Sequence, residues 1–112
     1  MSEISWEDFE KVDVRGGTVV ESGPFPEARK PSIKLLVDFG PEVGTRKTSA
    51  QLTAHYEPEK LVGRQVVAVV NFPSKRIAGF ESEVLVLGVP DGKEDVVLLS
   101  PDREVPPGGR MF

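Results

Sequence analysis

The stretch from Asn71 to Gly88 carries the residues whose types and spacing are most suited to chemistry. It connects two apolar segments, and between them lie the adjacent cations Lys75 and Arg76, followed by the pair Ser82–Glu83. These polar groups are expected to meet where two strands are joined, so they predict a surface for an anionic, hydrogen-bonding ligand. This is not the composition of a catalytic centre.

Cations are concentrated in one part of a chain that is acidic overall. The formal net charge is −4, which taken alone argues against a nucleic-acid partner. Residues 29–76 nevertheless hold nine Lys or Arg against four Asp or Glu, and the rest of the chain holds five against fourteen. Such a chain can present a local basic face. The alternative is a solvated surface of mixed charge. The cations expected on neighbouring strands and loops are Arg29, Lys30, Lys34, Arg46, Lys47, Lys75 and Arg76.

The remaining composition favours a non-catalytic binding protein. The chain has no cysteine, which excludes disulfides, a thiol nucleophile and a cysteine-ligated zinc. His55 is the single histidine, and its sequence neighbours offer neither a nucleophile nor a metal cage. No glycine loop of the phosphate-binding kind is present. We therefore expect no enzymatic activity, no cofactor and no metal. Without a long apolar run, we also expect no membrane insertion and a cytoplasmic location.

The elements that position these residues are predicted to be short strands. Val-rich segments alternate with turns rich in Gly and Pro, of which there are 11 and 10. The clearest strand is 32–39, where Ile33, Leu35, Val37 and Phe39 share one face. Other strands are expected over 12–21, 45–52, 64–70, 83–89 and 96–99, and we expect 64–70 and 83–89 to be buried on both faces.

Two short helical segments complete the predicted architecture. Ser5 and Asp8 are spaced as a capping box, so a short helix is expected within 1–11. Pro58 opens a helical turn that Gly63 closes. Gly16–Gly17 predicts a sharp bend in the first strand. The predicted order is three strands, a helical turn and two strands, which is the order of the OB-fold. Residues 1–112 are therefore predicted to form one all-β domain, a five-stranded barrel.

Several sequence blocks closely resemble those of the CsaA family of small export-related, chaperone-like proteins, and they occur in the same order as in that family. They are residues 13–16, 26–31, 37–40, 49–51, 61–66, 71–73 and 82–88. They are similar, more loosely, to the tRNA-binding domain of methionyl-tRNA synthetases, although Leu85 stands where those domains usually carry Met. The resemblance covers about residues 8–112. It implies an OB-fold, a homodimer and binding of tRNA through one barrel face, together with binding of unfolded or pre-secretory polypeptides.

The resemblance also implies which residues contact RNA. The corresponding positions are Lys30, Lys34, Ser49, Asn71, Arg76, Ser82 and Glu83, and the basic turn adds Lys75. Several of them have an equally simple structural interpretation. Asn71 would then cap its own loop, and the hydroxyls of Ser49 and Ser82 would satisfy barrel backbone. Glu83 would either accept from a base amino group or hold Lys75 or Arg76 in an ion pair.

Aromatic residues beside the basic turn suggest a second kind of ligand. Phe72 and Phe80 flank this turn, where they would stack on unpaired bases, line an apolar pocket for a peptide side chain, or pack the end of the barrel. The predicted function is therefore non-catalytic tRNA binding, and the alternative is a chaperone that binds unfolded or pre-secretory polypeptides.

The two ends of the chain are predicted to form a homodimer interface. Trp6 and Phe9 lie on the N-terminal helix, and Met111 and Phe112 end the C-terminal extension 101–112. An apolar terminus is unusual for a free tail, and a second subunit would bury it. The alternative is that these residues cap the open end of the barrel.

Overall fold

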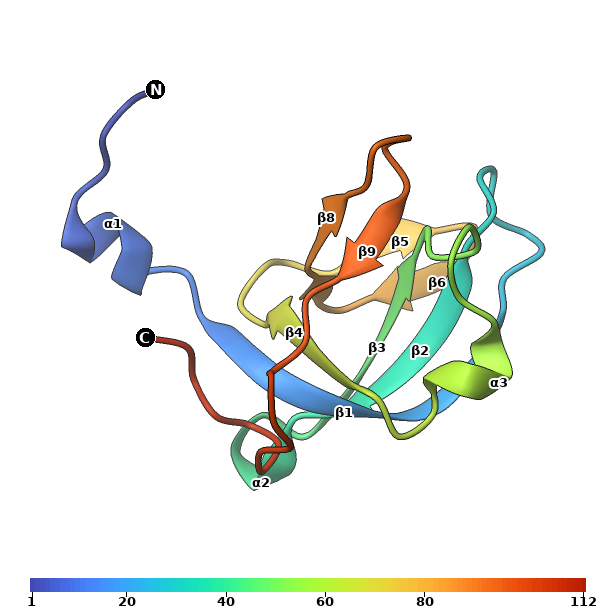
Figure 1. Ribbon diagram of the computed structural model, residues 1–112. Coiled ribbons are helices and arrows are strands. Elements are labelled where there is room, and N and C mark those ends of the chain that lie inside the picture. The colour runs from blue at the N-terminus through green and yellow to red at the C-terminus, as the bar shows by residue number, and fades with distance from the viewer.

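One antiparallel sheet of five strands, in the order β3-β2-β1-β4-β7, curls into a nearly closed barrel (Figure 1). The computed structural model describes residues 1–112. Its elements are α1 (Trp6–Glu10), β1 (Val14–Pro24), β2 (Ile33–Asp38), α2 (Gly40–Val43), β3 (Thr45–Ala50), α3 (Pro58–Leu61), β4 (Gln65–Val69), β5 (Lys75–Ile77), β6 (Phe80–Ser82), β7 (Leu85–Val86), β8 (Gly88–Pro90) and β9 (Val96–Leu98). The predicted OB-fold barrel is confirmed, with its short N-terminal helix and a helical turn between the third and fourth strands.

Alternation along β2 fills the barrel interior. Ile33, Leu35 and Val37 are at most 2% exposed, and Phe39 follows them into the core. Their predicted common face is therefore confirmed. Residues from β1, β4, α3 and the segment after β3 complete the core, among them Val19, Val66, Leu61 and Leu52. The three helices have only four or five residues each, too few to span a bilayer.

The long first strand is shared by both halves of the barrel, and its register shift lies beyond the Gly16–Gly17 pair at which a bend was predicted. Its first part pairs with β4 (Val14↔Val69) and its second part with β2 (Pro24↔Ile33), and the register shifts between Val19 and Glu21. A side chain at Gly17 would place its Cβ 2.6 Å from Val37 Cγ1 and 2.7 Å from the Phe39 ring. Only glycine lets β1 cross this close to the core.

The segment 83–89 differs from its prediction as a single strand buried on both faces. It is divided into β7, which pairs with β4, and β8, which turns away to pair with β9. Leu85 and Val89 are 48% and 50% exposed. The preceding segment is also more ordered than expected, because β5 and β6 form a hairpin. Its turn places Ala78 and Gly79 at positive φ, the geometry of tight hairpin turns.

The C-terminal tail docks on the edge of β1 that β2 leaves free. The amide of Gly108 donates to Gly16 O (2.8 Å), and the amide of Met111 donates to Val14 O (2.7 Å). At the other end of the chain, Ser5 and Asp8 form the predicted capping box. Helix α1 projects from the barrel on the side where the C-terminus also lies (Figure 1).

Candidate nucleic-acid interface

A groove of about 1320 Å³ opens between the loop that joins β1 to β2, the end of β3, the β5–β6 hairpin and β7. Four cations line it, two from the loop and two from β5: Arg29, Lys30, Lys75 and Arg76. Its apolar lining includes Val86, the exposed side chain of Leu85 and the half-exposed ring of Phe72. The groove thus combines cations that suit phosphates with apolar surface that suits the face of a base or an apolar side chain.

Six of the eight residues predicted to contact RNA line this groove. They are Lys30, Ser49, Lys75, Arg76, Ser82 and Glu83. Residues separated by up to 53 positions meet here because β3 runs beside the chain that leaves the β5–β6 hairpin. The two others, Lys34 and Asn71, lie elsewhere. Arg46 and Lys47, also expected on the basic face, do not line the groove.

Hydrogen bonds at the base of the groove show that the hydroxyl of Ser82 is structural and that the hydroxyl of Ser49 is free. Thr48 Oγ1 donates to Val84 O (2.8 Å), so its contact with Ser82 Oγ (3.0 Å) uses the proton of Ser82. Ser82 Oγ also accepts from the amide of Ser49 (3.3 Å). The buried Ser82 hydroxyl therefore joins β3 to β6, whereas the Ser49 hydroxyl forms no hydrogen bond within the molecule.

Glu83 closes the barrel and supplies the groove with a carboxylate. Its amide donates to Lys47 O (2.8 Å), and its Oε1 accepts from the amide of Lys47 (2.9 Å). The ion pair with Lys75 or Arg76 that we considered is not formed. Arg76 instead pairs with Glu81 across the β5–β6 hairpin (3.1 Å).

Comparison with known proteins decides the family. Residues 14–110 match the family described as "Putative tRNA binding domain". The chain belongs to this family. The predicted resemblance of this tRNA-binding domain to CsaA proteins is also confirmed.

Solved and curated relatives of the domain fall into two groups. The crystal structure of chaperone CsaA from Bacillus anthracis has 54% identity and a TM-score of 0.91, and the match covers 99% of this chain and 100% of that one. CsaA chaperone protein from Picrophilus torridus has 44% identity and a TM-score of 0.91, with 98% and 100% covered. Methionine–tRNA ligase of Pyrococcus furiosus is 40% identical over 111 residues, which are 99% of this chain. The chain spans only 15% of that ligase.

Lys34 and Phe80 form a separate cluster beside the groove of the domain. Lys34 Nζ lies 4.6 Å and 5.0 Å from the centroids of the Phe25 and Phe80 rings, and Lys47 Nζ lies 5.5 Å from that of Phe80. The two rings pack edge to face at 5.4 Å. Contacts of this kind stabilise by about 0.5–1 kcal/mol each at exposed sites. Phe80 therefore supports the hairpin rather than lining the groove, which matches the packing alternative.

Asn71 connects the end of β4 to the N-terminal segment. Its side chain accepts from the amide of Asp13 (3.0 Å) and donates to Lys11 O (2.8 Å). Next to it, Arg15 forms a half-buried hub that the sequence did not reveal, with bonds to Asp13 Oδ1 (2.7 Å) and Gly108 O (3.1 Å). The hydrogen bond from Arg15 lowers the pKa of Asp13. This cluster holds the C-terminal tail, and none of its residues lines the groove.

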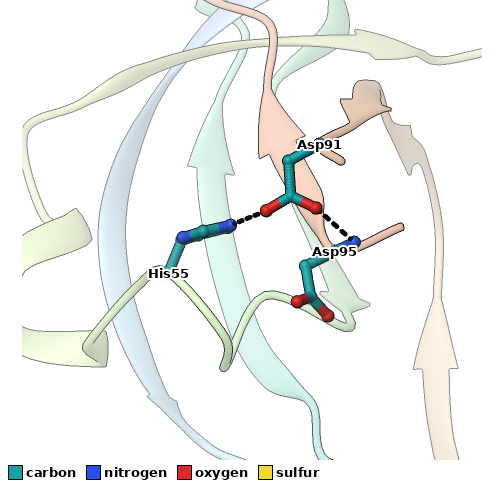
Figure 2. Close-up of side chains that lie close together, drawn as sticks. All are labelled: His55, Asp91 and Asp95. Atoms are coloured by element: carbon teal, nitrogen blue, oxygen red, sulfur yellow. Dashed lines mark hydrogen bonds and ion pairs between the residues drawn. The ribbon is translucent and has the colours of Figure 1, made fainter. Parts of the chain in front are cut away.

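A second polar cluster joins the loop after β3 to the turn between β8 and β9 (Figure 2). His55 Nε2 lies 2.6 Å from Asp91 Oδ2, and Asp91 Oδ1 accepts from the amides of Lys93 (2.8 Å) and Asp95 (3.0 Å). The hydrogen bond with His55 is the main cause of a lowered pKa of Asp91. The sequence neighbours of His55 gave no sign of this partner, because it lies 36 positions away. With Asp95 the set offers three ligand atoms within 4.8 Å of one another, but both oxygens of Asp91 already serve this connection.

The four residues predicted at a dimer interface lie on two adjacent segments. Trp6 and Phe9 pack against each other on α1 in a tilted arrangement, with ring centroids 5.4 Å apart. The guanidinium of Arg110 donates to Glu10 O (2.6 Å), which brings the tail to this helix. Trp6, Met111 and Phe112 are 65%, 45% and 103% exposed. Within one chain, these three side chains therefore do not cap the barrel.

Proposed function

We propose that the domain binds tRNA through the groove and catalyses no reaction. One observation carries the proposal: four cations from two separate segments converge on a single groove in a chain whose net charge is −4. The family match and the similarity to methionine–tRNA ligases support tRNA as the partner. We place the same function in the cytoplasm.

Size and lining of the groove favour an RNA over a small molecule. Its volume of about 1320 Å³ exceeds the roughly 300–1,000 Å³ of ordinary ligand pockets. Phe72 is the one aromatic residue in the lining, so stacking on a series of bases is limited. Contacts to phosphates and to the shape of a folded RNA would then supply most of the affinity.

Salt dependence of tRNA binding tests this proposal. Each neutralised phosphate contributes about −0.7 to −0.9 to the slope of log affinity against log salt concentration. If all four groove cations contact phosphates, we expect a slope of about −2.8 to −3.6 in a titration of labelled tRNA. Absence of binding at low salt, or a slope close to zero, would refute it.

Polypeptide binding is the second candidate. It is favoured by similarity to two proteins described as CsaA chaperones and by the apolar groove lining, in which the Phe72 ring is 52% exposed. Phe72→Ala should then weaken suppression of the aggregation of an unfolded model substrate, even at moderate salt. Leu99→Ala is the control, because Leu99 is exposed outside the groove. Equal suppression by both variants would exclude the groove as the peptide site.

A homodimer formed through α1 and the C-terminal tail is part of the proposal. Its support is the exposed apolar surface of Trp6, Met111 and Phe112, which the link between Arg110 and Glu10 gathers on one side of the molecule. Burial of apolar area drives association of this kind.

A further inference from the structure

An unpaired carboxylate in the wall of an RNA groove requires an explanation, because it repels phosphate. Glu83 is half-buried and is fixed at two points, since its amide and its Oε1 both bond to the backbone of Lys47. The orientation of its carboxylate therefore does not depend on a ligand. A side chain held this way discriminates between ligand groups better than a mobile one.

The other oxygen of Glu83 has no partner in the molecule. No cation forms an ion pair with this carboxylate, although Lys75 and Arg76 line the same groove. An ionised carboxylate only accepts hydrogen bonds. The ligand group that lies against it must therefore be a donor, and Glu83 neutralises none of the four groove cations.

Neighbouring groups complete a place for one unpaired base. The Ser49 hydroxyl and the Gln51 amide line the groove and form no side-chain hydrogen bonds within the molecule. Leu85, which is 48% exposed, and Val86 supply apolar surface next to Glu83. A base could lie on this surface with its edge toward the carboxylate, as bases do in single-strand recognition.

We propose that Glu83 makes the groove select unpaired bases that carry an exocyclic amino group over uracil. This rests on the proposed binding of RNA in the groove. The N4 amino group of cytosine donates to a carboxylate. Uracil has a carbonyl oxygen at the same position, and two acceptors placed together repel each other.

The test compares oligocytidine with oligouridine of equal length, two pyrimidine strands with the same number of phosphates. At one salt concentration the unaltered protein should bind oligocytidine about tenfold more tightly, as expected for one well-placed base contact. Glu83→Gln should reduce this preference to about twofold or less, because the amide can donate to uracil O4. Its oxygen can still accept from the Lys47 amide, so the barrel closure is retained.

Two controls separate base selection from charge and from folding. Glu27→Gln removes the same charge from another groove residue and should keep the preference. Oligocytidine dimethylated at N4 offers no donor at that position, so it should bind the unaltered protein about tenfold less tightly than oligocytidine. This ligand-side comparison does not depend on the stability of any variant.

Each outcome decides between the two proposals. Equal binding of oligocytidine and oligouridine, or a preference that persists in Glu83→Gln, overturns the role of Glu83 and leaves the proposed function intact. Binding of tRNA without binding of either oligonucleotide overturns it too, because the selection needs an unpaired base in the groove. Failure to bind any of these RNAs refutes the proposed function itself.

Discussion

Replacing both cations of β5 by alanine gives the sharpest test of the groove. Lys75→Ala/Arg76→Ala removes two of the four cations that line it. Both residues are exposed, and Arg76 pairs only with Glu81, at side-chain exposures of 71% and 40%. A surface pair of this kind stabilises by about 0–1 kcal/mol, so we expect the fold to be kept.

The expected change in salt dependence follows from the number of phosphates that the double variant no longer neutralises. With two fewer phosphates neutralised, the slope of log affinity against log salt concentration should be shallower by about 1.4–1.8. Between about 50 and 200 mM salt, the affinity of the unaltered protein for tRNA should fall roughly 50- to 150-fold. The affinity of the double variant should fall only about 7- to 12-fold over the same range.

The assay is fluorescence anisotropy of labelled tRNA over a salt series. Lys60→Ala/Lys93→Ala is the matched control, because it removes the same charge from α3 and from the β8–β9 turn, outside the groove lining. An unchanged slope in the groove variant would refute the reasoning. An equal reduction in both variants would refute it as well, because net charge alone would then explain the binding.

The remaining predictions concern the barrel, the polar connection at the β8–β9 turn and the dimer. Gly17→Ala should lower the free energy of unfolding by about 1–3 kcal/mol in a urea titration, because its Cβ would lie 2.6 Å from a β2 side chain; an unchanged midpoint would contradict the close crossing of β1. The lowered pKa of Asp91 means that the unfolded chain binds more protons between the native and the ordinary carboxyl pKa. Its stabilising contribution is therefore complete above the ordinary value of 3.8 and is lost as the pH falls through the native value. Asp91→Asn should flatten the acid side of the stability profile, and a profile identical to that of the unaltered protein would argue against the contact with His55. Trp6→Ala/Phe112→Ala should shift sedimentation toward the monomer, whereas a dimer of unchanged affinity would place the interface elsewhere.

Much of the fold could be predicted from local patterns. The alternation of Ile33, Leu35 and Val37 identified the inward face of β2, and the spacing of Ser5 and Asp8 identified the start of α1. Such signals are reliable because they depend on neighbours along the chain. The β5–β6 hairpin was missed because its turn is Ala78–Gly79, which lacks the usual Asn-Gly or Asp-Gly signal.

By itself the sequence determined the family, the all-β class and the order of the barrel strands. The cations Lys75 and Arg76, predicted in a turn, lie on strand β5 instead. Tertiary structure alone decided which polar residues share the groove. Lys34 lies against two aromatic rings, Asn71 bonds to a segment 58 positions away, and His55 meets Asp91. The physical reason is that a polar side chain bonds to whichever group the closed barrel brings near it. Strand register and loop course set that choice, and they depend on residues distant in the chain.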